Sequence, residues 1–189
     1  VIIEENSHID GIHVAGSSTN IIIRNHYSED LSHHYKVEKT PKITGDITFT
    51  GSSSGTIKKT VCKNIRINSS STVTVKDSFV IVDNESFGIL IDDSAVQLYR
   101  NYIEVQSGTN YYVSGIGISN MNKNVVISNN IIYVNNLIDA AANNTAFGIY
   151  VSNVASYLYL INNFIFTRAQ PSRNTKGIYT YNTGNALVI

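Results

Sequence analysis

Short runs in which apolar and polar residues alternate cover most of the chain, and they recur in a fixed order. Each unit has a Gly-Ile run such as "GIGI" at 115–118, a second run that ends in a polar pair, and a third run after that pair. Alternation with a period of two is typical of a β-strand with one buried face. No run shows sustained helical spacing with caps. The pattern therefore predicts an all-β fold with three short strands per repeat.

The polar pair marks one corner of the repeat, as in "NNIIYVNN" at 129–136. Asparagine is a poor strand former but tolerates left-handed backbone angles, which a sharp corner between two strands requires. Stacked asparagines can also hydrogen-bond to one another in a ladder. The spacing of the corners leaves room for one degenerate turn, expected around 45–51. The expected ladder members are Asn25, Ser78, Asn101, Asn130 and Asn163.

The Gly-Ile runs give a second set of equivalent positions. Tight Asn-Gly or Gly-Gly turns, which hairpins need, do not occur at the junctions between the strands. A coil explains the repeat better, because each strand then pairs in parallel with its equivalent one turn away, at roughly 4.8 Å. Like residues would then stack in columns. The expected interior column is Ile12, Ile89, Ile116, Ile149 and Ile178.

The unit "GIxV…VxIxNNxIxV" resembles the repeat of right-handed parallel β-helix proteins, clearly over 79–189 and less so over 1–78. That pectate-lyase-like superfamily includes polysaccharide lyases, phage tailspikes, surface adhesins and NosD-like periplasmic proteins. The resemblance implies a single-stranded right-handed parallel β-helix with three strands per coil and about six to seven coils. We expect one domain over 1–189, with an irregular coil at 28–60. A fold shared by so many activities does not supply one.

The composition of the chain argues against some classes of binding partner. Charged residues make up 15% of the chain, against about 25% in average domains. The 14 basic and 14 acidic side chains balance, which argues against nucleic acids and anionic membranes as partners. No apolar run reaches the roughly 18 residues of a membrane span. The single cysteine, Cys62, excludes an intramolecular disulfide and is interpreted as a small core residue.

The chain opens on "VIIEE" and closes on "NALVI", both strand-like, so we expect a processed form or a piece of a longer protein. The expected location is extracellular or at the cell surface, with the periplasm as an alternative. Exposed end coils would also present strand edges, which predicts end-to-end self-association as an alternative to neighbouring domains.

The superfamily resemblance implies two kinds of catalytic site, and both point to Asp92 and Asp93. Lyases of this fold use clustered carboxylates that bind calcium, and hydrolases use paired carboxylates. No further carboxylate follows in the matching turns, so these two are interpreted as solvated turn residues, with a calcium site as the alternative. Metal binding by histidine is not expected, because His13 and His26 fall on different faces and "SHHYK" is interpreted as a loop. The five histidines are His8, His13, His26, His33 and His34.

The outward positions suggest a binding face. The outward residues of the Gly-Ile runs are His13, Leu90, Gly117, Tyr150 and Tyr179. Those of the run after the corner are Ile81, Glu104, Tyr133 and Phe166. Long, variable connections return to each Gly-Ile run, and such insertions often build the binding face of a solenoid. The predicted ligand-binding residues are Tyr150, Tyr179, Tyr111, Tyr112 and Arg168, with Asp139 and Arg173 as further rim candidates.

These observations favour a secreted or cell-surface β-helical scaffold or adhesin-like module that contacts a polysaccharide or cell-surface glycan. No cofactor is expected. A polysaccharide lyase or glycoside hydrolase, or a fragment of one, is the first alternative. A NosD-like periplasmic accessory protein is the second. Whether the chain is an enzyme is left open, with binding favoured over catalysis.

Overall fold

The structure is a computed structural model of the 189-residue chain. It describes residues 2–5, 11–25, 43, 45–109, 112–137, 145–170, 174–183 and 187–188.

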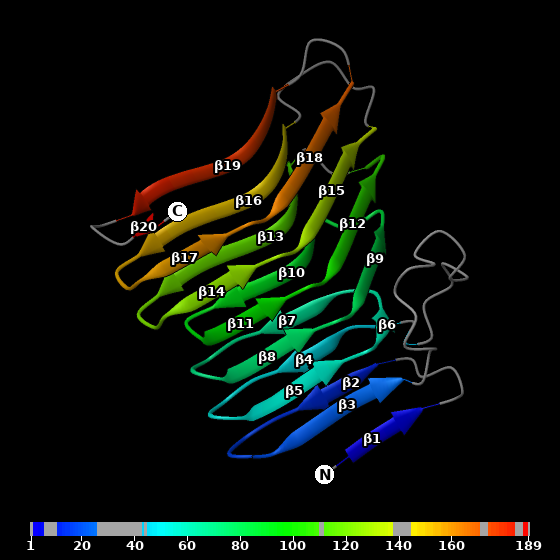
Figure 1. The fold of residues 1–189 in the computed structure, drawn as a ribbon, viewed down its shortest axis with the longest axis vertical. Helices are drawn as coiled ribbons and strands as arrows, with labels where there is room; N and C mark the ends of the chain where they lie inside the picture. The colour runs from blue at the N-terminus through cyan, green and yellow to red at the C-terminus, as the bar shows by residue number, and fades with distance from the viewer. Residues whose placement is uncertain are drawn as a thin grey trace.

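Three sheets stack their strands from the N-terminal to the C-terminal end (Figure 1). Sheet A has the order β1 (Ile2–Glu5), β3 (Ile21–Asn25), β5 (Ser54–Lys58), β8 (Thr72–Lys76), β11 (Ala95–Tyr99), β14 (Val125–Ser128), β17 (Leu158–Ile161) and β20 (Leu187–Val188). Sheet B has the order β6 (Val61–Cys62), β9 (Phe79–Asp83), β12 (Tyr102–Ser107), β15 (Ile131–Asn136) and β18 (Phe164–Ala169). Sheet C has the order β2 (Ile12–Val14), β4 (Ile47–Phe49), β7 (Ile65–Ile67), β10 (Phe87–Asp92), β13 (Tyr112–Met121), β16 (Thr145–Val154) and β19 (Asn174–Thr183).

Every pairing between these strands is parallel, and each strand pairs with its equivalent in the neighbouring coil, as β10 does with β13 and β13 with β16. The chain passes through sheets C, A and B in turn, so one coil uses one strand of each. The predicted fold class, an all-β right-handed parallel β-helix with three strands per coil, is confirmed. The expected six to seven coils stay a prediction, because the three sheets hold different numbers of described strands.

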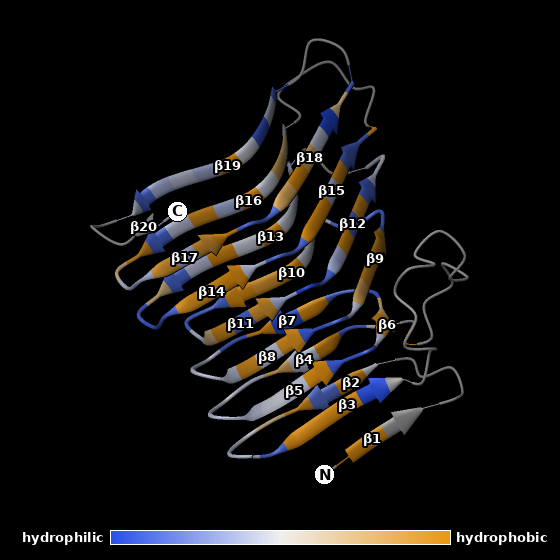
Figure 2. Cartoon of the chain, viewed as in Figure 1, coloured by the Kyte–Doolittle hydropathy of each residue, from blue (hydrophilic) through white to orange (hydrophobic). Residues whose placement is uncertain are grey.

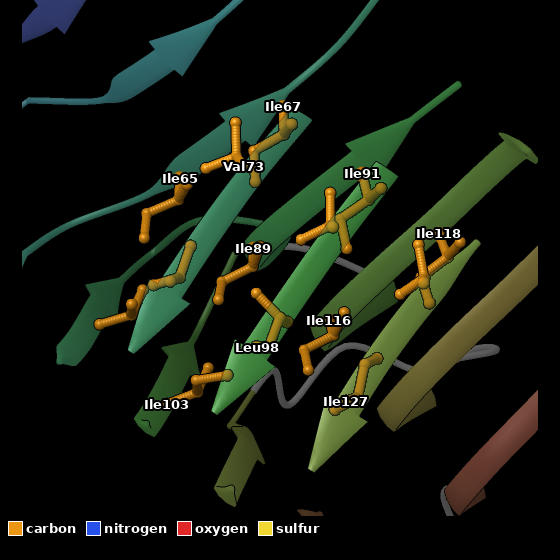
Figure 3. Close-up of a cluster of buried hydrophobic side chains, with 14 of the residues drawn as sticks. Ile65, Ile67, Val73, Ile89, Ile91, Leu98, Ile103, Ile116, Ile118 and Ile127 are labelled. Carbon is orange, nitrogen blue, oxygen red and sulfur yellow. The ribbon is translucent and has the colours of Figure 1, made fainter. Parts of the chain in front are cut away.

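The interior is built from stacked columns of β-branched and aliphatic side chains. Ile89, Ile116 and Ile149 are register partners and are fully buried. Figure 3 shows Ile65, Ile89 and Ile116 following one another along the axis, beside a parallel row of Ile67, Ile91 and Ile118. Ile12 and Ile178 belong to the same column, as predicted, and are less buried. Figure 2 shows the apolar residues concentrated on the strands, which fits a solenoid whose core is continuous from coil to coil.

A buried amide ladder runs along the corner between sheets A and B. The N–H and Nδ2 of Asn101 both donate to Oδ1 of Asn130 at 3.0 Å, and those of Asn130 both donate to Oδ1 of Asn163 at 3.0 Å. Each Nδ2 also donates to a sheet A carbonyl of the preceding coil, for Asn101 that of Val75 at 2.9 Å. Each carboxamide thereby satisfies backbone groups that the corner takes out of the sheets. The predicted ladder is confirmed for Ser78, whose N–H donates to Oδ1 of Asn101, and for the three asparagines.

The left-handed backbone angle lies on the residue before each ladder member. The φ angles of Arg100, Asn129 and Asn162 are 49°, 55° and 50°, whereas the ladder asparagines have no positive φ. At these corners the bend and the stacking therefore fall on two successive residues, the first of the pair bending the chain and the second joining the ladder. This is why the corner carries a pair of polar residues.

The first coils depart from the predicted ladder. Ile23 is buried in the column of Ile57 and Val75, whereas Ile22 is only partly buried, so Asn25 falls one position before the ladder. The assignment of Asn25 is therefore a register error of one residue. Thr60 is the ladder member that prediction missed, since its N–H donates to Oγ of Ser78 at 3.3 Å.

The glycines of the Gly-Ile runs stand where the chain bends from sheet B into sheet C. A Cβ atom on Gly115 would collide with Cγ2 of Ile132 and lie 2.8 Å from the carbonyl oxygen of Gly148. Gly148 meets the same obstacle in Ile165. At this bend the strand backbone therefore passes against core side chains, and only glycine fits.

Cys62 is fully buried in the sheet B column beside Val80, which agrees with its interpretation as a core residue. Burial, with a contribution from the charge of Asp46, raises the pKa of its thiol to about 12. A thiol held in the protonated form is a poor nucleophile.

Two regional predictions can be compared with the strands. β4 and β5 lie within 28–60 and pair in register with both neighbours, so the expected irregular coil does not extend over them. Residues 28–42 lie outside the described residues. Over the described ranges, the structure contains no helix with the length and apolar character needed to cross a membrane.

Candidate functional site

The outer face of sheet C carries a column that changes from coil to coil. Leu90, Gly117, Tyr150 and Tyr179 are successive register partners on β10, β13, β16 and β19, in the predicted order. His13 starts the same outward series further toward the N-terminus and is followed by Thr48. The aromatic side chains therefore gather over the last coils.

These residues lie in a groove of about 660 Å³ on the outer face of sheet C. Four strands contribute to it, so it crosses the coils rather than following one of them. The lining is mainly apolar and aromatic, with hydroxyl and amide groups interspersed, which is the usual make-up of a small-molecule site. The lining residues are Ser86, Phe87, Leu90, Tyr112, Val113, Ser114, Gly117, Ile118, Ser119, Thr145, Phe147, Tyr150, Asn174, Lys176, Tyr179 and Tyr181.

Phe147 is the centre of the aromatic cluster. Its ring centroid lies 5.3 Å from that of Tyr150 in an edge-on arrangement and 5.4 Å from that of Tyr179. The Tyr150 and Tyr179 rings are 5.7 Å apart, and Tyr112 stacks on Phe147 at 6.5 Å. Phe147 is 7% exposed, whereas Tyr112 is 60% exposed. A buried ring thus holds partly exposed rings in place, which reduces the entropy that a ligand would have to offset.

Lys176 is the one charged side chain among the described residues that line the groove. Its Nζ lies 3.9 Å from the centre of the Tyr179 ring, within the range of a cation–π contact. The groove is therefore slightly cationic where it meets β19.

Asp92 and Asp93, the weak catalytic candidates, lie at the turn between β10 and β11 and are held by hydrogen bonds. Oδ1 of Asp92 accepts from Ser119 Oγ and from Asn120 Nδ2, each at 3.0 Å. The carboxylate of Asp93 accepts from Asn122 Nδ2 at 3.4 Å. Asp93 also has a left-handed φ of 43°. These contacts fit the interpretation of turn residues, and neither carboxylate lines the groove.

A second amide ladder, not predicted from the sequence, continues from this turn. Nδ2 of Asn153 donates to Oδ1 of Asn120 at 3.3 Å, and Nδ2 of Asn182 donates to Oδ1 of Asn153 at 2.9 Å. All three have left-handed φ angles near 50° and are exposed to solvent. In this ladder the same asparagines adopt the left-handed angle and hydrogen-bond to one another. In the buried ladder these two roles fall on successive residues.

The other predicted site residues are only partly brought together. Tyr112 lies in the groove with Tyr150 and Tyr179. Arg168 occupies an exposed position of β18 in sheet B and does not line the groove. Three candidates lie outside the described residues: Tyr111, Asp139 and Arg173.

No metal centre is visible in the part of the chain that the structure describes, where no three His, Cys, Asp or Glu side chains are placed to hold an ion. His13 is exposed. The remaining histidines, His8, His26, His33 and His34, lie outside the described residues.

Prediction missed Phe147 and Lys176, although a signal for them exists. Both occupy the position immediately before the glycine of the Gly-Ile run, and their register partners are Phe87 and Ser114. These four residues form a second outward column beside the first. The bend at the glycine breaks the alternation, so a strict period of two loses this column.

The outer face of sheet B provides a contrasting aromatic pair. Tyr133 and Phe166 stack with their ring planes nearly parallel and their centroids 5.0 Å apart, in the predicted column. Neither lines the groove, so this pair can serve as a control surface.

No protein-family model, curated protein or solved structure matches the chain. The fold is therefore established by the structure itself, as a three-sided parallel β-helix.

Proposed function

We propose that this chain is a glycan-binding module of a secreted or cell-surface protein, and that the groove on sheet C holds the glycan. The observation that carries the proposal is the cluster of Phe147, Tyr150 and Tyr179, partly open to solvent and bordered by hydroxyl and amide groups. A pyranose ring has C–H bonds on its faces and hydroxyls around its edge. An aromatic floor with a polar rim complements both.

The geometry also separates glycans from other ligands. Polyanions such as nucleic acids need a stripe of basic side chains. Among the described residues that line the groove Lys176 is the one basic side chain, and the net charge of the chain is zero. A quaternary ammonium ligand would need the ring faces, and one of them already carries Lys176. A neutral ligand with apolar faces and many hydroxyls fits the remaining surface.

Nothing observed at Asp92 and Asp93 favours the lyase or hydrolase hypothesis over binding, because both carboxylates are engaged in the turn between β10 and β11. The NosD-like alternative gains no support either, because His13 is the only histidine that the structure describes.

A glycan array tests the proposal. Intact protein should give signal on a subset of glycans, and the double variant Tyr150→Ala with Tyr179→Ala should lose at least about tenfold in signal, corresponding to roughly 1.4 kcal/mol. The matched control is Tyr133→Ala with Phe166→Ala, which removes two stacked rings from sheet B and should leave the signal unchanged. Absence of signal on every glycan, or equal loss in both double variants at equal thermal stability, would contradict the proposal.

A further inference from the structure

One member of the outward column in the groove has no side chain. Gly117 stands between Leu90 and Tyr150, which both fill their positions. Its φ angle is not in the left-handed region, so the backbone does not require glycine. A Cβ atom built there would meet only Leu90 Cδ1 at 3.2 Å and Ser114 Oγ at 3.6 Å. The contact with Leu90 is tight, but Cδ1 is the end of a flexible side chain that can move aside, so a side chain is accommodated more easily here than at Gly115.

Gly117 lines the groove without a side chain, so the floor is lower there than at Tyr150, and we call this low point the hollow. Its wall toward β10 is the apolar end of Leu90, and its wall along β13 includes the hydroxyl of Ser114, a residue only 9% exposed. The Ser119 hydroxyl already donates to Asp92, whereas that of Ser114 has no hydrogen-bond partner among the described residues. The hollow thus combines an apolar wall, the end of Leu90, with one hydrogen-bond donor beside it.

An acetamido group fits this combination. Its methyl group would contact Leu90 in the hollow, and its carbonyl oxygen would accept from the Ser114 hydroxyl. The pyranose ring that carries it would then lie toward Tyr150 and Tyr179. A hydroxyl at the same carbon would leave the hollow unfilled and the Leu90 surface uncovered.

The positive charge of Lys176 also favours N-acetylated amino sugars over free amino sugars. Lys176 holds its cationic ammonium group over the Tyr179 ring. A free amino sugar is also a cation and would be repelled, whereas acetylation of the nitrogen removes that charge. The hollow at Gly117 and the charge of Lys176 therefore both favour an acetamido group.

We infer that the groove is specific for glycans containing N-acetylated amino sugars, and that the hollow at Gly117 reads the acetyl group. This inference rests on the proposed glycan-binding function.

The test compares sugars that differ at one carbon. Binding is measured by calorimetric titration with chitin, chitosan and cellulose oligomers of equal length, and with N-acetylgalactosamine- and galactose-terminated glycans. The acetylated member of at least one set should bind about tenfold or more tightly than its unacetylated counterparts. Gly117→Leu should abolish this preference and leave the weaker binding of the unacetylated sugars unchanged. Lys176→Gln should strengthen binding of chitosan oligomers but not of chitin oligomers.

The control variant is Gln97→Leu, which places the same side chain at an exposed outward position of sheet A and should change no affinity. If glycans bind but acetylated and unacetylated members bind equally, or if Gly117→Leu leaves their ratio unchanged, the inference fails while the proposed function stands. If no glycan binds in titration or on the array, both fail.

Discussion

One inner column of sheet C repeats isoleucine from coil to coil, whereas the neighbouring outward column of the same strands contains several residue types. Ile65, Ile89, Ile116 and Ile149 stack inside, while Arg66, Leu90, Gly117 and Tyr150 occupy the next position along the strand and point outward. Inside, each side chain packs against its own equivalent, so like residues fit best. Outside no such condition applies. The interior of the coils therefore specifies the fold, and the outer face is free to carry a site.

The largest effect should come from breaking the buried amide ladder. Asn130→Ala removes the acceptor for two donors of Asn101 and the donor to the carbonyls of Leu98 and Ser128. Leaving these groups buried without partners should lower the free energy of unfolding by about 3 kcal/mol.

The exposed ladder supplies the matched control for that change. Asn153→Gly removes the same group at a solvent-exposed, left-handed position, where water replaces its partners and glycine keeps the backbone angle. The loss should stay below about 1 kcal/mol in urea unfolding. Equal losses in the two variants would show that burial does not distinguish the ladders.

Two glycines of β13 separate fold from site most sharply. Gly115→Ala forces Cβ against Ile132 and the carbonyl of Gly148, so the free energy of unfolding should fall by about 1–3 kcal/mol. Gly177→Ala, at the equivalent position of β19, meets nothing within 4 Å and should cost much less. Gly117→Ala should leave stability nearly unchanged, because only the flexible end of Leu90 must move. Thermal and urea unfolding of the three variants check this order, and a Gly117→Ala loss as large as that of Gly115→Ala would overturn it.

A smaller, pH-dependent effect should come from Cys62. Its pKa of about 12 in the folded protein lies above the value of about 8.5 for a free thiol, so the unfolded chain loses the proton first. The stabilising effect is complete below about pH 8.5 and is lost as the pH rises toward 12. Stability between these pH values should therefore fall more steeply in the parent protein than in Cys62→Ala. Identical pH profiles would contradict the burial of this thiol, as would its labelling by iodoacetamide in the native state.

The smallest effect is expected at Asp92. Asp92→Ala removes two hydrogen bonds at a partly exposed turn, which should cost at most about 1 kcal/mol, and glycan affinity should not change. Calorimetric titration with the best array ligand measures the affinity. Release of shortened products from a polysaccharide, lost in this variant, would instead support the enzymatic alternative.

Much of the interior could be predicted from the sequence because equivalent positions stack on one another and favour similar residues, which produces a visible repeat. The Gly-Ile column and the asparagines at 101, 130 and 163 are visible without a structure. Asn25 was assigned to the ladder wrongly because the three successive isoleucines in "IIIRN" do not show which of them face the interior. Thr60 was missed because the extra turn between Asn25 and Ser78 was expected around 45–51 and not at residue 60.

The groove was harder to predict, for a physical reason. Tyr150 and Tyr179 follow strict alternation and were found. Phe147 and Lys176 precede the glycine bend, where two successive residues face inward and the period of two is interrupted. The hollow at Gly117 was also invisible, because a glycine in sequence does not reveal whether it relieves a collision, as Gly115 does, or leaves a space.

The most direct test of the account is an NMR titration of the isotope-labelled protein with the glycan that gives the strongest array signal. Amide and aromatic resonances of Gly117, Phe147, Tyr150 and Tyr179 should shift with a common saturation curve, while those of Tyr133 and Phe166 stay in place. Shifts confined to sheet B, or to the turn of Asp92 and Asp93, would contradict a binding groove on the outer face of sheet C.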